Sequence, residues 1–586
     1  MDYKKIISEA INIKGVSAEE IYAALTVPAE RRLGDFTLPC FRWAKMLKAS
    51  PAVIAEGIKA AFISPPFISK TEAVGGYLNF YIDDGHFARG VVEKYFDGSL
   101  FGRTDAGRDK NIVIDYSSVN IAKPLHIGHL STTAIGGALV NIFRHLGYNV
   151  TGINHLGDYG TQFGKLIAAY LRIGDEDDVK KRGVQALTEI YREYEKLEQT
   201  EPDILTEART WSAKIERDDP EAVRLFDNFK KITLKEVKSV YKQLGIKFDS
   251  YLGESFFARR TGAVVKELMR MGLLEDSDGA KVVRLGEGAQ PCLILRSDGA
   301  SLYATRDLAA AEYRYKKYKF DKCLYVVAYQ QNLHFKQFFK VMELMGKPWA
   351  ADLVHVAFGM VSLEEGTIST REGRVVLLKD VLNSATEKAR SLMVERGYTD
   401  ADIDKVSAEV GTGAVIYSAL SSARIKDIQF SYDKVLNFEG ETAPYLQYTH
   451  ARCCSVLKKR GQITNYKLQT TNYEYDVIST EAEKSQPINI LLDCENYCTD
   501  EESISLLKAL DNYAASITEA AAKYEPCVLS KQLIEIAKAY SKFYMENPIL
   551  KAEPEVRAAR LLLTRMTQDI LKEGLALLLI KAPEKM

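Results

Sequence analysis

The chain has 586 residues, more than a single hydrophobic core accommodates, so we expect about three to five domains. Its 46% hydrophobic and 27% charged residues are ordinary for a water-soluble globular protein. A formal net charge of −1 excludes a whole-molecule field that attracts nucleic acid, so any RNA-binding surface must come from local basic patches.

The cysteines and the apolar segments indicate the cellular compartment of the protein. The eight cysteines form no CxxC pair, which favours a reducing compartment over a disulfide framework. Cys494 and Cys498 are four apart, but no second pair or nearby histidine completes a metal site, so we expect buried or idle thiols. Because no signal peptide and no long apolar segment occur, we predict a cytoplasmic protein that does not bind membranes.

Residues 1 to 107 form the first predicted domain. Helical patterns at 3–24 and 41–62 precede a predicted strand at 76–82. Alternate residues of that strand, such as Tyr77 and Asn79, share one face, which is also the ordinary arrangement of a half-buried strand.

A β-α-β unit is predicted next. The apolar run from Asn111 to Tyr116 suits a buried parallel strand. A helix should follow, with Pro124 in its first turn and Gly147 at its C-terminal cap. A second strand from Val150 to Asn154 would begin a doubly wound nucleotide-binding sheet.

Two histidines lie where that strand leads into the helix. His126 and His129 are three apart, so they share a face at the helix end whose unpaired N–H groups and dipole attract anions. Gly128 removes a side chain where a flat ring could lie against the backbone. A triphosphate suits this place, although four residues alone would equally fit the capping of an ordinary helix.

A charge-rich, mainly helical insertion is predicted at 173–288, without a catalytic constellation of its own. Strand and helix then alternate again, as expected for the second half of the sheet. Tyr303 and Asp307 are four apart there, and a buried carboxylate beside a phenol suits a guanidinium. Asp307 would alternatively be an ordinary acid in the first turn of a helix.

The C-terminal part is predicted to be helical. Residues 385–586 repeat apolar faces, apart from an expected exposed loop at 469–487. Aromatic, amide and basic residues gather near its start, where they would stack on splayed bases or pack between helices: Phe438, Tyr445, Gln447, Tyr448 and Arg452. The stretch 313–320 mixes bases with aromatics, and we interpret it as a helix end with its lysines in water.

The motifs resemble one enzyme family. His126-Ile127-Gly128-His129 resembles the HIGH motif of class I aminoacyl-tRNA synthetases, and SSVNIAKPLHIGHL with NHLGDYGTQFG is similar to the arginyl-tRNA synthetases. Further landmarks follow in the family's order: SLYATRD, VVAYQQNLH, FGMVSLEEGTISTREGR, FEGETAPYLQYTHAR and LALLLIKAPEKM. The resemblance extends from about Val74 to Met586.

That resemblance implies a multidomain α/β architecture. It comprises a small α+β N-terminal domain at 1–107 that binds the tRNA elbow, a Rossmann-type doubly wound parallel-sheet catalytic domain at 108–384, and an all-α anticodon-binding bundle at 385–586. The implied reaction is ATP-dependent formation of arginyl-adenylate and transfer of arginine to the 2′-hydroxyl of the terminal adenosine of tRNA(Arg), with activation dependent on tRNA. ATP and Mg²⁺ would act as a substrate complex, with no tightly bound cofactor or structural metal, and we expect a monomer.

The family's functional residues map onto this sequence. The implied catalytic residues are His126, His129, Lys123, Gly128 and Arg371. The implied arginine-binding residues are Asp115, Asn120, Tyr303, Asp307 and Gln331. The implied ATP-binding residues are His126, Gly128, His129, Ser369, Thr370 and Arg371. The implied tRNA contacts are Tyr77 and Asn79 for a D-loop base, and Tyr445, Gln447, Tyr448 and Arg452 in the bundle.

The second class I motif, TISTREGR, departs from the usual KMSKS pattern. Thr367 and Glu372 stand where lysines are common, which leaves Arg371 and Arg374 as the nearby cations. A loop that steadies leaving pyrophosphate needs positive charge, so Lys123 is expected to supply the missing cation, unless it is a solvated surface lysine.

Three rival functions are weaker. One rival is a synthetase for another amino acid, such as glutamate or cysteine, and Asp115 with Asp307 argues against an acidic substrate. A catalytically silent RNA-binding relative is opposed by the intact His126, His129, Asp307 and Gln331. Thr367 and Glu372 leave that interpretation open. A HIGH-type nucleotidyltransferase for small molecules would not need the long helical region after the active site.

Overall fold

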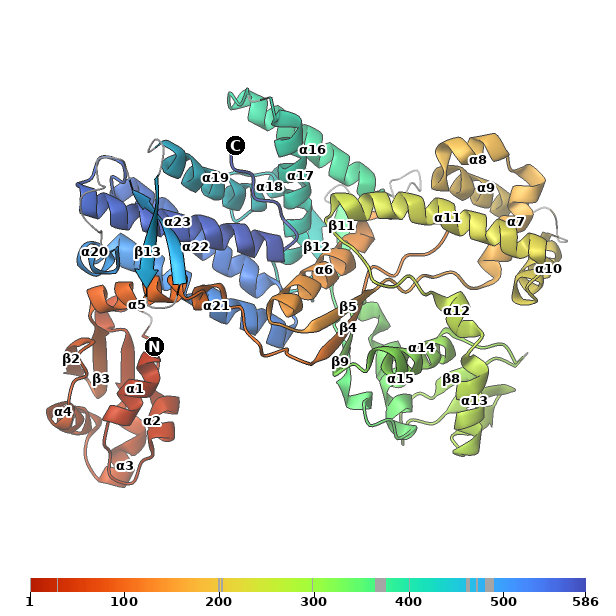
Figure 1. The fold of residues 1–586 in the computed structure, drawn as a ribbon. Helices are drawn as coiled ribbons and strands as arrows, with labels where there is room; N and C mark the ends of the chain where they lie inside the picture. Colours follow the sequence, from red (N-terminus) through yellow and green to blue (C-terminus); the bar gives the residue numbers. More distant parts are fainter. Residues whose placement is uncertain are drawn as a thin grey trace. The chain divides into compact units, whose positions relative to one another are not determined.

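The computed structural model describes most of the chain, in two compact units (Figure 1). The described residues are 2–28, 30–198, 201, 204–297, 299–363, 376–399, 401–459, 464–470, 473–479 and 490–586. The first unit consists of Met1–Phe101, Ser455–Asn512 and Lys538–Gln568. The second unit consists of Gly102–Cys454, Tyr513–Ala537 and Asp569–Met586.

The first unit begins with a small antiparallel sheet. Its strands lie in the order β1-β3-β2, with β1 at Phe36–Pro39, β2 at Ile68–Val74 and β3 at Tyr77–Ile82. The helices around it are α1 (Tyr3–Ala10), α2 (Ala18–Ala24), α3 (Ala44–Leu47), α4 (Pro51–Ala61) and α5 (Asp84–Phe96). Leu78 and Phe80 of β3 are fully buried, so the sheet has its own core.

A parallel sheet forms the centre of the second unit. Its order is β10-β9-β4-β5, with β4 at Asn111–Asp115, β5 at Asn149–Ile153, β9 at Lys322–Tyr325 and β10 at Leu353–His355. Helix α6 (Leu130–His145) joins β4 to β5 and lies beside them in Figure 1. Gly147 has φ +84°, the left-handed conformation expected after the helix. The predicted β-α-β unit and doubly wound parallel sheet are thus confirmed.

The start of α6 differs in one detail from the sequence prediction. Pro124 lies in the loop before the helix instead of in its first turn. The helical segment opens with a 3₁₀ turn at Ile127–His129, which continues directly into α6.

The insertion is mainly helical, as predicted. Its helices are α7 (Thr161–Ile173), α8 (Glu176–Arg182), α9 (Val184–Leu197), α10 (Ile204–Glu216), α11 (Pro220–Gln243), α12 (Glu254–Ala258) and α13 (Thr261–Arg270). A small antiparallel sheet follows, formed by β6 (Leu274–Ser277), β7 (Ala280–Val283) and β8 (Cys292–Leu295). Helix α14 (Tyr303–Tyr318) then leads into β9, and α15 (Asn332–Leu344) leads to β10.

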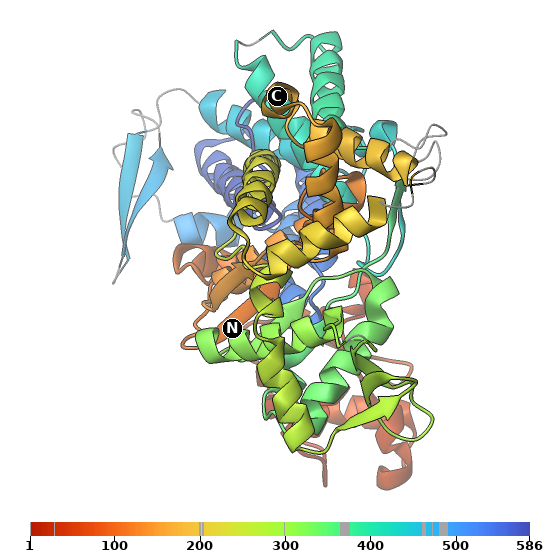
Figure 2. The ribbon, with the colours of Figure 1, turned by 90° about the vertical axis from the view of Figure 1, so that its right-hand side faces the viewer.

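The rest of the chain is mostly helical. Its helices are α16 (Leu378–Glu395), α17 (Ile403–Leu420), α18 (Tyr432–Val435), α19 (Ala443–Lys459), α20 (Ile490–Tyr497), α21 (Glu501–Lys523), α22 (Cys527–Glu546) and α23 (Pro554–Leu577). Strands β11 (Val361–Leu363) and β12 (Ile428–Phe430) pair in parallel. Strands β13 (Thr464–Thr470) and β14 (Tyr473–Ser479) form an antiparallel hairpin, at the left of Figure 2. The prediction of an exposed loop at 469–487 is therefore partly wrong.

Two broader features follow from burial. All eight cysteines are free and buried, including Cys494 and Cys498, as predicted for them. In the part of the chain that the structure describes, no helix is both long enough and apolar enough to span a bilayer.

Candidate active site

The loop between β4 and α6 has a strained backbone. Ser117, Ser118 and Ala122 have φ values of +70°, +42° and +61°, which side chains beyond glycine rarely adopt. A buried network holds this conformation: the hydroxyl of Ser117 lies 2.6 Å from that of Tyr241, and its N–H donates to Thr132 Oγ1 at 2.9 Å. Strain of this kind is typical of functional loops, because the surrounding contacts must impose it.

The two histidines of the HIGH motif form one compact turn. His126 Nδ1 accepts a hydrogen bond from the N–H of Gly128 at 3.1 Å, and His129 Nδ1 accepts from the N–H of His126 at 3.3 Å. Their ring centroids are 4.0 Å apart. The predicted pairing of the rings at the helix amino end is therefore present.

Both imidazoles are neutral at neutral pH. Burial, with Lys123 nearby, lowers the pKa of His126, and burial lowers the pKa of His129 to about 3. Because Nδ1 of His126 accepts a hydrogen bond from Gly128, Nε2 of that ring carries the proton and is a hydrogen-bond donor. Nδ1 of His129 lies 3.3 Å from both the N–H and the carbonyl oxygen of His126. Each neutral ring has one N–H donor, and Lys123 is exposed.

The second class I motif lies outside the described residues, and with it Thr367, Ser369, Thr370, Arg371 and Glu372. The backbone directly after it pairs with the HIGH segment. Ile127 N–H donates to Val376 O at 3.0 Å, and Leu378 N–H donates to Leu125 O at 2.9 Å. The chain therefore returns from the second motif to the first.

Asp307 lies in the first turns of α14, held by a histidine. Its Oδ2 accepts a hydrogen bond from His334 Nε2 of α15 at 2.7 Å. Burial alone would raise the pKa of Asp307, but the hydrogen bond and charge of His334 outweigh it and lower that pKa. Tyr303 packs its ring 4.7 Å from that of His334 and is 52% exposed. Tyr303 and Asp307 thus meet at His334, with the phenol reaching solvent.

Asp115 ends β4 and forms a buried ion pair. Arg314 Nη2 donates to its Oδ2 at 2.7 Å, and Ser118 donates to its Oδ1 at 3.1 Å. Burial disfavours the charge of Arg314, yet the Asp115 carboxylate raises the pKa of the guanidinium overall. We expected the 313–320 stretch to end in solvent; its lysines are exposed, but Arg314 points inward, since it is one helical turn from the buried Ala310.

Sequence reasoning missed a second carboxylate near Asp307. Glu254 begins α12 and pairs with Arg306 at 3.3 Å. Burial, opposed by Arg306 and reinforced by the charge of Asp307, raises the pKa of Glu254 to about 7. A lone glutamate in a charge-rich insertion gave no signal, because its approach to α14 depends on tertiary packing.

Asn120 and Gln331, which we predicted to contact arginine, are both exposed. Asn120 forms a backbone bridge with Gly157, which joins the SSVNIAKP loop to the segment after β5. Gln331 ends a short 3₁₀ turn at Tyr329–Gln331, directly before α15. The carboxyl ends of β4, β5 and β9 thus bring Asp115, Asn120, Gln331 and the HIGH turn to one region of the fold.

The predicted RNA contacts of the first unit divide into two kinds. Tyr77 is 43% exposed, and its ring meets the equally exposed Phe41 edge-on at 5.1 Å. Asn79 is instead buried, and its Oδ1 accepts a hydrogen bond from Thr37 at 2.6 Å. The prediction that Asn79 reads a base is not supported, because its amide oxygen joins β3 to β1.

Helix α19 shows the same division. Tyr448 is exposed and Arg452 stacks over its ring at 4.8 Å, with Tyr445 one turn earlier. Gln447 is fully buried, and its Nε2 donates to Lys581 O at 2.8 Å and Glu409 O at 3.2 Å. The structure therefore contradicts a base contact by Gln447: its amide anchors the C-terminal segment.

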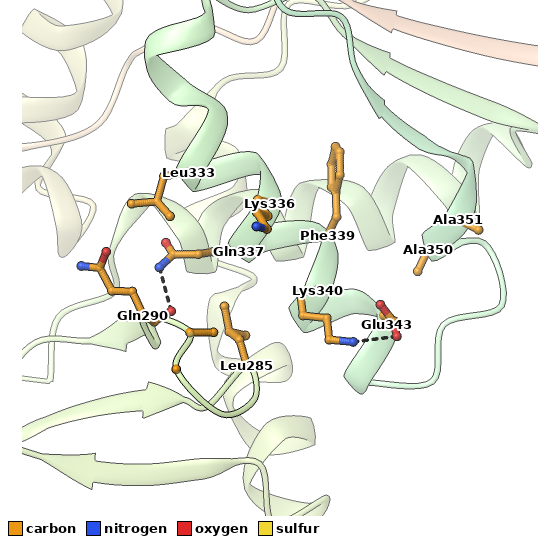
Figure 3. Close-up of a pocket in the computed structure, with 12 residues that line it drawn as sticks. Leu285, Gln290, Leu333, Lys336, Gln337, Phe339, Lys340, Glu343, Ala350 and Ala351 are labelled. Carbon is orange, nitrogen blue, oxygen red and sulfur yellow. Dashed lines mark hydrogen bonds and ion pairs between the residues drawn. The ribbon is translucent and has the colours of Figure 1, made fainter.

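A separate cavity of about 700 Å³ opens on the outer face of α15 (Figure 3). Neither His334 nor any predicted site residue lines it. Gln337 points toward the 285–290 loop and donates to Gln290 O at 3.1 Å. Within the described ranges, no group of three or more histidine, cysteine or acidic side chains is arranged to hold a metal ion.

Known proteins resemble this chain over its whole length. The arginine–tRNA ligases of Clostridioides difficile and Halothermothrix orenii are each 43% identical, over 100% of both chains. The solved arginyl-tRNA synthetase of Thermus thermophilus superposes with a TM-score of 0.75 at 25% identity, covering 96% of each chain.

Family models match in the same order along the sequence. The model described as tRNA synthetases class I (R), catalytic domain, matches residues 95–432, so fold and site define a class I aminoacyl-tRNA synthetase. The arginyl tRNA synthetase N terminal domain matches residues 1–82, and the DALR anticodon binding domain matches residues 446–586. The chain belongs to the arginyl-tRNA synthetase family.

Proposed function

We propose that this chain activates L-arginine with ATP and transfers it to the 2′-hydroxyl of the terminal adenosine of tRNA(Arg). The observation that carries this function is the pairing of two subsites at one sheet edge. The HIGH turn offers neutral N–H donors, and the same unit carries buried Asp115 and the partly buried acids Asp307 and Glu254. The first suits phosphates, and the second suits a doubly cationic amino acid.

The arginine would bind by its two cations. Asp307 with Glu254 would receive the guanidinium, whose planar fork matches carboxylates well. Asp115, with Asn120, would hold the ammonium, and Tyr303 and Gln331 would border the pocket. An acidic substrate would meet repulsion from the same carboxylates, which argues against a glutamate enzyme.

In the activation step, the arginine carboxylate would attack the α-phosphorus of ATP in line with the departing pyrophosphate. Mg²⁺ would accompany the triphosphate as part of the substrate complex and offset its charge. His126 and His129 would donate their Nε2–H groups to phosphate oxygens, with Gly128 leaving room for the nucleotide. Lys123 would add a cation, together with Arg371, Ser369 and Thr370 of the second motif.

The tRNA would contact surfaces in both units. Tyr77 with Phe41 offers an exposed aromatic pair for an unpaired base, and Tyr448 with Arg452 offers a ring and a guanidinium. Tyr445 would extend the second surface. We assign no base contact to Asn79 or Gln447.

The proposal also assigns a function to each domain, an oligomeric state and a location in the cell. Residues 1–107 would bind the tRNA elbow, 108–384 would catalyse, and 385–586 would bind the anticodon. The enzyme would act as a cytoplasmic monomer, because one chain carries all the site residues named above.

The direct test is ATP–pyrophosphate exchange with each of the twenty amino acids, with and without tRNA. Exchange with arginine that depends on tRNA is expected. Exchange with another amino acid would overturn the substrate assignment. RNA binding without any exchange would favour a catalytically silent RNA-binding relative, because the second motif lacks the usual lysines.

A further inference from the structure

A partly buried histidine, His155, has no role in the chemistry proposed above. His155 lies two residues beyond β5 and stacks on Phe257, with ring centroids 5.5 Å apart and planes 12° from parallel. Its Nδ1 lies 3.1 Å from Nη2 of Arg314, the same nitrogen that donates to Asp115. Asp115, Arg314 and His155 therefore form one hydrogen-bonded chain.

The hydrogen bond from Arg314 determines which ring nitrogen of His155 carries the proton. A guanidinium has only donors, so Nδ1 of His155 must accept. Burial lowers the pKa of His155, which keeps the ring neutral. The proton of the neutral ring is therefore on Nε2.

Nε2 of His155 is buried and has no hydrogen-bond partner among the described residues. A buried N–H without an acceptor is costly and rare, which indicates that an acceptor approaches when the site is occupied. Besides Asp115, the carboxylates of Asp307 and Asp158 favour the charged form of His155. Both oxygens of Asp158 already accept hydrogen bonds from Ser255 and Lys230, whereas Asp307 accepts only through Oδ2 among the described hydrogen bonds. A carboxylate offers about four lone-pair sites, so one more donor leaves room for a guanidinium.

We propose that Arg314 and His155 are positioning residues of the arginine site, and that His155 donates Nε2–H to Asp307 when arginine is bound. Asp115, Arg314, His155, Asp307 and His334 then form one continuous chain. This inference rests on the proposed function, since it takes Asp115 and Asp307 as the partners of the ammonium and the guanidinium.

This chain of hydrogen bonds would fix the distance between the carboxylates of Asp115 and Asp307. Arginine has a set distance between its ammonium and its guanidinium, so a fixed separation favours it over homoarginine, which is one methylene longer. Stacking on Phe257 and the ion pair with Asp115 hold the two linking side chains from both sides.

Substitutions at His155 separate the two ring nitrogens. His155→Gln carries an amide N–H near the position of Nε2, whereas the shorter His155→Asn reaches only the position of Nδ1. We expect His155→Asn to raise the KM for arginine about 10- to 100-fold, the range for a hydrogen bond to a charged group, and His155→Gln to recover most of it. The KM for ATP and for tRNA should not change in either variant.

The same variants report on specificity. The preference for arginine over homoarginine, as a ratio of kcat/KM values, should fall in His155→Asn and in Arg314→Lys, which keeps the charge and loses the planar fork. Thermal unfolding of each variant, with and without arginine, shows whether it folds and whether arginine still stabilises it. The arginine-induced rise in Tm should shrink in His155→Asn.

Three results would overturn the inference. These are an unchanged KM for arginine in folded His155→Asn, equal losses in His155→Asn and His155→Gln, or a fall in kcat with every KM unchanged. Failure of the wild-type enzyme to exchange pyrophosphate with arginine would instead overturn the proposed function, so the two failures are distinguishable.

Discussion

The phosphate end and the arginine end of the site are built by different means. The HIGH turn comes from four consecutive residues, and its two rings are fixed by backbone hydrogen bonds within the same turn. The arginine end collects side chains from β4, α12, α14 and α15, held by ion pairs between distant segments. Under the proposed function, neutral donors would meet the anionic substrate, and carboxylates would meet the cationic groups of arginine.

This difference follows from the cost of burying charge. A helix amino end already favours anions, so neutral imidazoles are sufficient there. A guanidinium taken out of water needs a formal negative charge close by, and that charge must itself be stabilised while the pocket is empty. Arg314 and His334 serve Asp115 and Asp307 in this way.

The largest expected effect is at the arginine end. Asp307→Asn removes the charge that we propose receives the guanidinium and should lower kcat/KM for arginine about 1,000-fold, since breaking a buried charge pair costs about 3–5 kcal/mol. The loss should be in the KM for arginine, with the KM for ATP unchanged. Steady-state aminoacylation measures both, and Asp321→Asn, at the amino end of β9, is the control. An unchanged KM for arginine would place the guanidinium elsewhere.

A substitution in the HIGH turn should lower kcat instead of raising the KM for arginine. His129→Ala deletes one N–H donor and should lower kcat for pyrophosphate exchange about 100-fold, with little change in the KM for arginine. Because the pKa of His129 is about 3, no loss of activity from its titration is expected between pH 6 and 8. A kcat that falls as pH rises through 6.5, in step with an imidazole, would contradict the neutral assignment of both rings.

A pH dependence should instead come from Glu254. Its pKa is about 7 in the empty site, and the ionised form attracts a guanidinium, so the KM for arginine should fall as pH rises through 7. The change should be about threefold to tenfold between pH 6 and 8.

Glu254→Gln should make the KM for arginine independent of pH over that range. The same change should stabilise the empty enzyme above pH 7 by about 2–3 kcal/mol. The sign follows because a carboxyl pKa raised from 4.5 to about 7 on folding costs stability once the group ionises. A KM that still depends on pH in Glu254→Gln would assign the titration to another group.

The two ends also differ in how far the sequence predicts them. The β-α-β unit and the two histidines at the start of its helix follow from local periodicity and spacing, which act over a few residues. The family resemblance then singles out Asp307 and the HIGH motif as site residues. Glu254, Arg314 and His155 lack such a signal, because burial brings them together over sequence separations of 50 to 200 residues, as between Asp115 and Arg314. A sequence pattern records which face a residue has, but seldom which distant charge it meets.

Amides mark another limit of sequence reasoning. Asn79 and Gln447 sit beside the exposed Tyr77 and Tyr448, and the family resemblance suggested base contacts for all four. In the structure both amides turn inward to backbone or side-chain acceptors and donors. Gln447 and Tyr448 are neighbours on a helix and therefore point in different directions. Asn79 shares a strand face with Tyr77, but it lies deeper in the sheet, where Thr37 of β1 donates to its amide oxygen.

A further modest effect tests that division on α19. Tyr448→Ala should raise the KM for tRNA about 10-fold, within the range for loss of one stacked base, and should leave Tm nearly unchanged because the ring is exposed. Tyr448→Phe keeps the stacking face and is the matched control. Gln447→Ala should do the opposite: it removes the buried amide that donates to the carbonyls of Lys581 and Glu409, and should lower the free energy of unfolding by about 1–3 kcal/mol. Aminoacylation kinetics and chemical denaturation of the three variants measure these effects. A tRNA-specific defect in Gln447→Ala at full stability would return Gln447 to the RNA surface, and with it the view that the whole cluster reads bases.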